Sequence, residues 1–242
     1  IPDVLDVWID AGSASWNCLN TLKTEEEFNE WFPADFILEG KDQIRGWFNL
    51  LTIASIIMFD KPAFENVFVH GFITGVDGVK MSKSLGNIIS PYEVTDKYGA
   101  DTLRYYTSKI KAGEDLAWSW DEVKQHYRNL SILHNVGNYM LDLAKQVEGD
   151  GFDVKSLVAS DVTIETMSAA GNEEKYILSK LNSNLAEMTK LLDSYELHKV
   201  ATQFEEVLLE FSRTYIQAIR DKVQVGPAER EAVFKTMYVV FN

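Results

Sequence analysis

Residues 35–70 read DFILEGKDQIRGWFNLLTIASIIMFDKPAFENVFVH, with two short apolar runs on either side of a longer one. The short runs, residues 35–39 and 67–70, are rich in apolar and aromatic side chains and end at a glycine or a turn, as strands do. The longer run predicts a helix over residues 41–59, closed by a proline. Strand, helix and strand form the crossover unit of a parallel sheet. Residues 4–9 predict a further strand, so we expect an α/β fold here.

The sequence that follows predicts the first residues of two helices. Residues 90–93, Ser-Pro-Tyr-Glu, combine an N-cap, a proline at the first helical position and a glutamate at the third, and Gly99 would end this helix. Residues 119–122, Ser-Trp-Asp-Glu, repeat the capping pattern. We place a domain boundary just before the second start. The expected domains are an α/β domain of residues 1–117 and a helical domain of residues 118–242.

Apolar residues recur with a period of 3.6 beyond Ser119, which predicts an all-α helix bundle. The polar, glycine-flanked stretch of residues 149–171 predicts a connecting loop. The residues expected to face the core form three stripes: Val123, Leu130, Leu133, Val136, Met140, Leu141 and Ala144; Ile177, Leu178, Leu181, Leu185, Met188 and Leu192; and Val200, Phe204, Val207, Leu208, Phe211, Tyr215 and Ile219.

The composition is that of a globular chain, with 242 residues of which 46% are hydrophobic. A single cysteine, Cys18, excludes an internal disulfide framework and favours a reducing, cytoplasmic location. The longest apolar run is far shorter than the roughly 20 residues that a membrane-spanning helix needs, so we expect no membrane segment. The net charge of -14 argues against a general polyanion binder. Any contact with RNA must therefore come from a local basic face.

Residues 71–87, GFITGVDGVKMSKSLGN, carry the most informative chemistry. Asp77-Gly78 between two valines predicts a tight hairpin. Beyond it, Lys80 and Lys83 alternate with serines between glycines, which would present ammonium and hydroxyl donors on one loop. Such donors suit a polyphosphate whose phosphorus is under attack, although the spacing is not that of a P-loop. The plainer alternative is a solvated turn, where lysine and serine are common.

A second polar segment, residues 39–48, directly follows a predicted strand and reads EGKDQIRGWF. Ligands of open α/β sheets bind at the carboxyl ends of strands, so Glu39 and Asp42 are candidates to bind an amino group or ribose hydroxyls. Alternatively, Asp42 favours the helix N-terminal dipole and Glu39 is a surface charge. Gly46 inside a helix would cost roughly 1 kcal/mol relative to alanine, which indicates a close approach by another group.

The loop sequence Lys80-Met81-Ser82-Lys83-Ser84 is identical to the KMSKS signature of class I aminoacyl-tRNA synthetases. The resemblance implies that this part of the chain is the second half of a Rossmann-like catalytic domain, followed by an anticodon-binding domain. It also implies that Lys80 and Lys83 are catalytic residues that stabilise the transition state of amino-acid activation. Met81, Ser82 and Ser84 would contact ATP.

Within class I, residues 39–48 resemble the "EGxDQxRGWF" segment of isoleucyl-tRNA synthetases. Residues 6–13, DVWIDAGS, are similar to that family's "DVWFDSGS" and differ at Ile9 and Ala11. Residues 98–104, YGADTLR, are similar to its "YGADALR". The resemblance implies contacts with the adenylate for Glu39, Gly40, Asp42 and Gln43, a place near the amino-acid pocket for Trp47, and a place beside the adenine for His70 and Gly71.

The resemblance implies a reaction as well. The intact enzyme would activate isoleucine with ATP, accompanied by Mg²⁺, and transfer it to tRNA(Ile); we expect no protein-bound metal in this part of the chain. The family's His-Ile-Gly-His-like element and its editing domain do not occur in the 242 residues, and we expect both upstream of Ile1. The chain alone is therefore expected to be inactive.

Two alternatives stay open at this point. The first is another specificity within class I, valyl or methionyl, because pockets separate such side chains by only ~1–3 kcal/mol. The second is a non-catalytic module that binds RNA or a protein partner.

Overall fold

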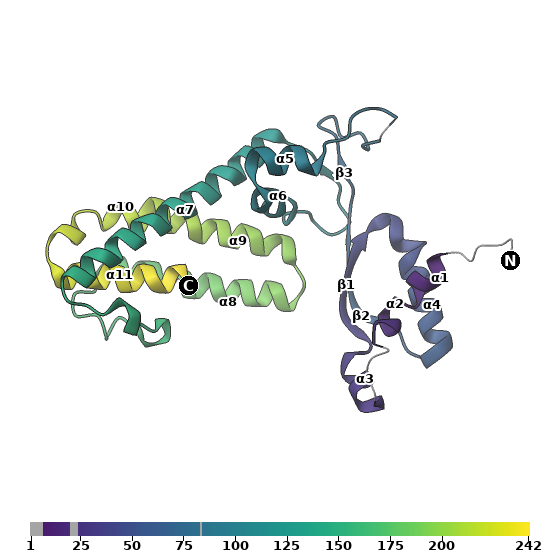
Figure 1. Ribbon diagram of the computed structural model, residues 1–242, viewed down its shortest axis with the longest axis horizontal. Helices are drawn as coiled ribbons and strands as arrows, with labels where there is room; N and C mark the ends of the chain where they lie inside the picture. The colour runs from purple at the N-terminus through teal and green to yellow at the C-terminus, as the bar shows by residue number, and fades with distance from the viewer. Residues whose placement is uncertain (1–6, 20–23, 83) are drawn as a thin grey trace. The chain divides into compact units, whose positions relative to one another are not determined.

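The computed structural model describes residues 7–19, 24–82 and 84–242 (Figure 1). The chain divides into two compact units. The first contains the described residues up to Ile89 together with Ile110–Trp118, and the second contains Ser90–Lys109 and Ser119–Asn242. Among the described residues, every helix is too short or too polar to span a bilayer.

The first unit is built on the predicted crossover. Strand β1 (Ala34–Gly40) pairs in parallel with β2 (Phe64–His70), from Ala34 opposite Phe64 to Gly40 opposite His70. Helix α4 (Trp47–Phe59) connects them and buries Leu51 completely. The strand–helix–strand prediction is confirmed, and both strands deliver their carboxyl ends to the same edge of the sheet.

Helix α4 begins later than the sequence predicted. Residues Lys41–Ile44 form a short 3₁₀ turn, η1, and Gly46 is the N-cap of α4, with φ −103° and ψ −103°. The expectation that Gly46 lies inside a helix is therefore wrong. A Cβ at Gly46 would lie 3.6 Å from the ring of Trp8, which is an ordinary van der Waals contact, so the close approach expected there is not found either.

The predicted strand over residues 4–9 is also wrong for the part that the structure describes. Residues 4–6 lie outside the described residues, and Val7–Gly12 form helix α1. Helix α1 packs on α4: a Cβ at Gly12 would lie 3.1 Å from Leu50 Cβ, and Trp47 Nε1 donates to Ala11 O at 2.8 Å. A short apolar run fits a strand or a helix equally well, and this contact with α4 decides between them. Two short helices follow, α2 (Ala14–Asn17) and α3 (Glu25–Trp31).

A second small parallel pair completes the first unit. Strand β3 (Ile73–Thr74) pairs with β4 (Leu116–Ala117). After β3 the chain turns back, because Gly75 N donates to Val79 O at 2.8 Å and Gly78 takes a φ of 76°. This turn confirms the predicted hairpin and leads directly into the lysine loop.

The second unit consists of helices. They are α5 (Pro91–Tyr98), α6 (Ala100–Thr107), α7 (Trp120–Gly149), α8 (Asn172–Asp193), α9 (Leu197–Glu210), the π-helical η4 (Phe211–Tyr215), α10 (Ile216–Ala218) and α11 (Pro227–Phe241), with single 3₁₀ turns η2 (Val154–Ser156), η3 (Ala159–Asp161) and η5 (Lys222–Gln224).

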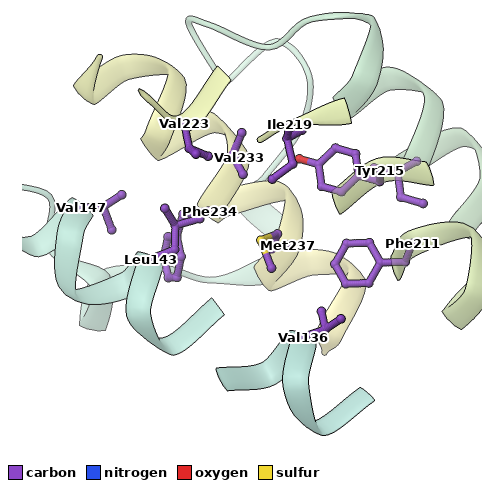
Figure 2. Packing of buried hydrophobic residues seen from close by; sticks show 11 residues of the cluster. Val136, Leu143, Val147, Phe211, Tyr215, Ile219, Val223, Val233, Phe234 and Met237 are labelled. Atoms are coloured by element: carbon purple, nitrogen blue, oxygen red, sulfur yellow. The ribbon is translucent and has the colours of Figure 1, made fainter. Parts of the chain in front are cut away.

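The core of the second unit joins α7, α8, η4 and α11 (Figure 2). Figure 2 shows Val136 and Leu143 of α7, Phe211 and Tyr215 of η4, and Met237 of α11 directed into one cluster. The parallel sheet followed by a helical bundle is the fold class that the sequence predicted.

The two predicted helix starts differ in outcome. Ser119 caps α7 as expected, because its Oγ accepts from Glu122 N at 3.2 Å. At the other start Pro91 does occupy the first turn of α5, and Gly99 ends that helix with a φ of 83°. The predicted side-chain cap is wrong, however. Ser90 makes no side-chain cap hydrogen bond, and Glu93 N bonds to the Ser90 carbonyl instead.

The apolar stripes were predicted only in part. In α7 the buried face runs through His126 and Asn129, whereas Leu141 is 57% exposed. Asn129 can be buried because its Nδ2 donates to Glu205 Oε1 at 2.7 Å, across the α7–α9 interface. On α8 the buried positions include Glu174 and Asn184. The predicted stripe residues that are exposed instead are Leu141 of α7, Leu185 and Leu192 of α8, and Phe204 of α9.

Candidate nucleotide-binding site

The carboxyl ends of β1 and β2 bring together two segments that the sequence singled out. Gly40 is paired with His70, and a Cβ at Gly40 would lie 3.4 Å from His70 Cε1 and 2.6 Å from Asp42 Oδ1. Gly40 is buried, whereas Glu39 and Asp42 are exposed. A Cβ at Gly40 would displace the Asp42 carboxylate and would contact the His70 ring. The glycine therefore lets a polar strand end and a histidine ring share one small space.

The geometry fixes the tautomer of His70. Its Nδ1 lies 2.7 Å from Gly71 O, and a carbonyl oxygen can only accept a hydrogen bond. Nδ1 therefore carries a proton, and in the neutral imidazole Nε2, which lies 3.8 Å from the position of a Cβ at Gly40, is the acceptor. A neutral His70 can accept a hydrogen bond from an amino or hydroxyl group of a ligand at the strand end.

The backbone on both sides of the strand end is ordered by short-range hydrogen bonds. Glu39 Oε2 accepts from Gly40 N at 3.1 Å, and Gln43 Nε2 donates to Asp42 Oδ2 at 3.2 Å. Gln43 Oε1 also lies 3.4 Å from Trp47 N, at the first turn of α4. The Trp47 indole N–H donates to Ala11 O at 2.8 Å, and its ring centroid lies 5.6 Å from that of Phe48.

Gly71 allows a third segment, residues 113–116, to lie against the chain at the end of β2. A Cβ at this position would lie 2.0 Å from Glu114 O, so only glycine fits. The adjoining backbones are tied by hydrogen bonds, from Gly113 N to Val69 O at 2.7 Å and from Leu116 N to Phe72 O at 2.9 Å. Asp115 is thereby brought to the site, where its Oδ1 accepts from Phe72 N at 2.7 Å.

An ion pair connects this third segment to the first. Lys41 Nζ lies 2.6 Å from Asp115 Oδ1. The hydrogen bond from Lys41, followed by that from Phe72 N, holds the pKa of the Asp115 carboxyl below its usual value. Asp115 is therefore ionised near neutral pH, and the Lys41 ammonium has a fixed partner.

Lys80, in the loop of residues 80–84, lies near the Lys41–Asp115 ion pair. Lys80 Nζ lies 4.3 Å from the centroid of the Phe72 ring, and Lys41 Nζ lies 4.9 Å from that centroid. Lys80 and the polar strand end, far apart in sequence, thus meet at Phe72 within one unit. Lys83 lies outside the described residues.

Asn87 shapes the rest of the loop. Its Oδ1 accepts from Ser82 N at 2.8 Å, and its Nδ2 lies 3.5 Å from Lys80 O. Ser82 Oγ lies 3.1 Å from Ser84 Oγ and accepts from Leu85 N at 3.2 Å. Met81 is half-buried, and Ser84 is exposed. The described part of the loop therefore contains a turn closed by hydrogen bonds to the side chains of Asn87 and Ser82.

Sequence reasoning missed four residues of this site: Lys41, Phe72, Asn87 and Asp115. Asp115 lies 74 residues from its partner Lys41, and no local pattern connects the two. The one available signal was Gly71, whose lack of a side chain marks a close backbone approach without identifying the partner. Among the described residues, we find no group of three or more His, Cys, Asp or Glu side chains that could hold a metal ion.

Comparison with known protein families agrees with this architecture. Residues 1–119 match the family described as tRNA synthetases class I (I, L, M and V). Residues 174–242 match the anticodon-binding domain of tRNA ligase.

Curated relatives are similar over the whole chain. An isoleucine–tRNA ligase of Methanothrix thermoacetophila is 39% identical over 100% of this chain and 23% of its own length. One of Methanosarcina barkeri is also 39% identical, over 100% of this chain and 22% of its own length. The chain therefore spans less than a quarter of the length of these relatives.

Solved structures share the fold at low sequence identity. The LeuRS of Agrobacterium radiobacter K84, in a ternary complex with tRNA and LeuAMS, superposes with a TM-score of 0.71 at 18% identity, over 100% of this chain and 30% of that chain. The methionyl-tRNA synthetase of Mycobacterium tuberculosis in complex with methionyl-adenylate gives 0.67 at 22% identity, over 99% of this chain and 46% of that chain.

Proposed function

We propose that this chain, which belongs to the class I aminoacyl-tRNA synthetases, is one part of an isoleucine–tRNA ligase. It would contain residues that bind ATP and the first portion of the anticodon-binding domain. The longer protein would join isoleucine to ATP, forming isoleucyl-adenylate and pyrophosphate, and then transfer the isoleucyl group to tRNA(Ile). The observation that carries this proposal is the meeting of Lys80 with the ends of β1 and β2 at Phe72.

The described side chains suit the two ends of an ATP molecule. Lys80 would place positive charge against the phosphates, where negative charge moves onto the leaving pyrophosphate. Ser82 and Ser84 would donate hydroxyl hydrogen bonds to the same group, and Lys83 would add a second ammonium. These donors are needed most in the transition state, so their loss should lower kcat.

The strand end would hold the nucleoside and the amino acid. Asp42 and Glu39 are exposed acceptors for ribose hydroxyls or an ammonium group, and the backbone at Gly40 and Gly71 would lie beside the adenylate. His70 would accept from the adenine side through Nε2. Gln43 and the ring of Trp47, at the start of α4, would face the amino acid. Mg²⁺ would arrive with ATP as part of the substrate.

The domain organisation follows from the same proposal. Residues 1–117 would serve ATP and isoleucine, and residues 118–242 would face the tRNA. The cytoplasm, where tRNA is charged, would be the place of action.

Isoleucine-dependent exchange of pyrophosphate into ATP by the full-length protein tests the proposal. Lys80→Ala should lower kcat by about 10²–10³-fold, as expected for removing a group that stabilises transition-state charge. Lys97→Ala, which removes an exposed lysine of α5, is the matched control and should keep the wild-type rate. Wild-type exchange by Lys80→Ala would contradict the role given to the loop.

The alternative is another specificity within class I, valyl or methionyl, because the matching family covers isoleucine, leucine, methionine and valine enzymes. Running the exchange assay with a panel of these amino acids separates the alternatives. Exchange that depends on valine or methionine rather than isoleucine would show that the protein is a valyl- or methionyl-tRNA synthetase. Absence of exchange with every amino acid, together with tRNA binding, would leave a non-catalytic RNA-binding module. We expect no exchange by the 242-residue chain on its own.

A further inference from the structure

Phe72 lies between the ends of β1 and β2 and the side chain of Lys80. Its backbone is fixed on both sides, because its N–H donates to Asp115 Oδ1 and its carbonyl accepts from Leu116 N at 2.9 Å. The preceding Gly71 touches the Glu114 carbonyl so closely that no side chain fits between them. The Phe72 ring is therefore attached to a frame of β2, β3 and β4 residues rather than to the lysine loop.

Two ammonium groups approach this one ring. Lys80 Nζ is 4.3 Å and Lys41 Nζ is 4.9 Å from its centroid, both within the range of a cation–π interaction. Lys41 has a carboxylate partner in Asp115, whereas no ion pair is found for Lys80 among the described residues. Lys80 is thus held by the ring rather than by a carboxylate. A cation held in this way keeps its charge uncompensated and available to an anion.

The alternative partners for Lys80 explain why an aromatic ring suits this position. A carboxylate in place of Phe72 would neutralise Lys80 and would have to be displaced by the phosphates. With no partner, the long side chain would sample many rotamers, and ordering it would cost binding free energy, since a lysine side chain loses up to about 2 kcal/mol of rotamer entropy when fixed. A ring limits the rotamers without competing strongly for the charge.

We propose that Phe72 is a positioning residue, whose ring holds the Lys80 ammonium beside the Lys41–Asp115 ion pair so that it is ready to receive the phosphates of ATP. This inference rests on the proposed function, because it assumes that Lys80 binds a polyphosphate. Phe72 would affect ATP binding through Lys80 and would not itself contact the reacting atoms.

The ring contact can be observed directly in the 242-residue chain. In a sample with ¹³C-labelled lysine, the ring current of Phe72 should shift the Lys80 Hε signals upfield relative to those of Lys155 in the second unit. Phe72→Leu should abolish this shift and Phe72→Tyr should keep it. Phe28→Leu, which removes a ring of the same unit that packs on Phe32, is the matched control and should leave the Lys80 signals in place. An unshifted Lys80 signal in the wild type would overturn the inference.

Kinetics of the full-length protein test the consequence. Phe72→Leu should raise the KM for ATP in pyrophosphate exchange by about two- to fivefold, the factor that corresponds to an exposed cation–π contact. The kcat should change less, and Phe72→Tyr should restore the wild-type KM. A wild-type KM in Phe72→Leu would overturn the inference.

The failure of this inference can be distinguished from failure of the proposed function. If Lys80→Ala is severely impaired while Phe72→Leu keeps its KM, only the role of Phe72 is lost. If Lys80→Ala exchanges pyrophosphate at the wild-type rate, the proposed function of the loop is lost, whatever Phe72 does.

Discussion

The two units of this chain bury their apolar residues to very different extents. The helical unit closes around one continuous cluster, in which Ile177, Ile219, Val233 and Met237 are each fully buried. The first unit has a two-stranded parallel sheet in which Leu38 and Val67 remain 46% and 45% exposed. Parallel sheets are usually covered on both faces, and two strands alone form a marginal sheet.

The difference shows where stability and ligand chemistry lie in this molecule. The helical unit has the larger buried apolar cluster and few buried polar residues, among them Asn129 and Glu174. In the first unit, the side chains that meet at the strand ends are held by hydrogen bonds, one ion pair and glycine contacts. We therefore expect core substitutions to act most strongly on the helical unit, and substitutions at the strand ends to act on ligands.

The largest effect on stability should come from the core of the helical unit. Phe234 is 1% exposed and packs against Phe152 and Tyr238, so Phe234→Ala would leave a cavity. We expect a loss of about 3–5 kcal/mol in the free energy of unfolding, measured by urea denaturation followed by circular dichroism at 222 nm. Leu192→Ala is the control, because Leu192 is 50% exposed, and its effect should be within about 0.5 kcal/mol. Equal losses from both variants would contradict the core assigned to this unit.

A smaller difference should separate two leucines of the first unit. Leu51 of α4 is completely buried, whereas Leu38 of β1 is 46% exposed. Leu51→Ala should cost about 2–5 kcal/mol of that unit's stability, and Leu38→Ala no more than about 0.5 kcal/mol. Hydrogen exchange of the β1 and β2 amides measures the stability of this unit separately. Faster exchange in Leu38→Ala than in Leu51→Ala would show that the face carrying Leu38 is covered in solution.

The smallest effect concerns the Lys41–Asp115 ion pair. The pKa of Asp115 lies below its usual 3.8 because the Lys41 ammonium, and next the Phe72 N–H, favour the ionised carboxylate. A pKa that is lower in the folded state gives a contribution to stability that is present above about pH 4 and is lost as the pH falls through the folded-state value. Following the ¹³C signal of the Asp115 carboxyl against pH should show this low pKa.

Lys41→Met should raise the pKa of Asp115 towards its usual range, while Lys61→Met, which removes a lysine elsewhere in the same unit, should leave it unchanged. An unchanged Asp115 pKa in Lys41→Met would mean that the ion pair does not form in solution.

The sequence predicted those parts of the fold that depend on local patterns. The β1–α4–β2 crossover followed from apolar runs separated by turn residues, and the turn before the lysine loop followed from Asp77-Gly78. The start of α7 followed from the capping serine, Ser119. In each case the signal lies within a short stretch of sequence, an apolar run, a turn dipeptide or a capping residue, so a reading of neighbouring residues was sufficient.

The failures have physical causes that a local pattern cannot reveal. Residues 7–9 form a helix because α1 packs on α4, whose partner surface lies some forty residues away. In α7 the buried face includes His126 and Asn129 in place of Leu141, since a polar side chain can be buried when a distant residue such as Glu205 bonds to it.

In the candidate site, too, the sequence predicted individual residues but not the contacts between distant segments. Lys80, Asp42 and His70 were predicted from the sequence, but the platform on which they meet was not. Phe72, Lys41 and Asp115 form this platform through contacts between three separate segments. A single phenylalanine after a glycine carries no signal of an approaching cation.

Labelling with an acyl-phosphate derivative of ATP tests most directly whether the lysine loop and the ends of β1 and β2 bind the same nucleotide. The reactive acyl group of this probe lies at the terminal phosphate, so it acylates lysines that contact the phosphates. In the full-length protein, we predict that Lys80 and Lys83 are acylated and that excess ATP prevents it, with Lys145 and Lys190 of the helical unit unaffected by ATP. Acylation protected by ATP at helical-unit lysines, with none at the loop, would contradict the account.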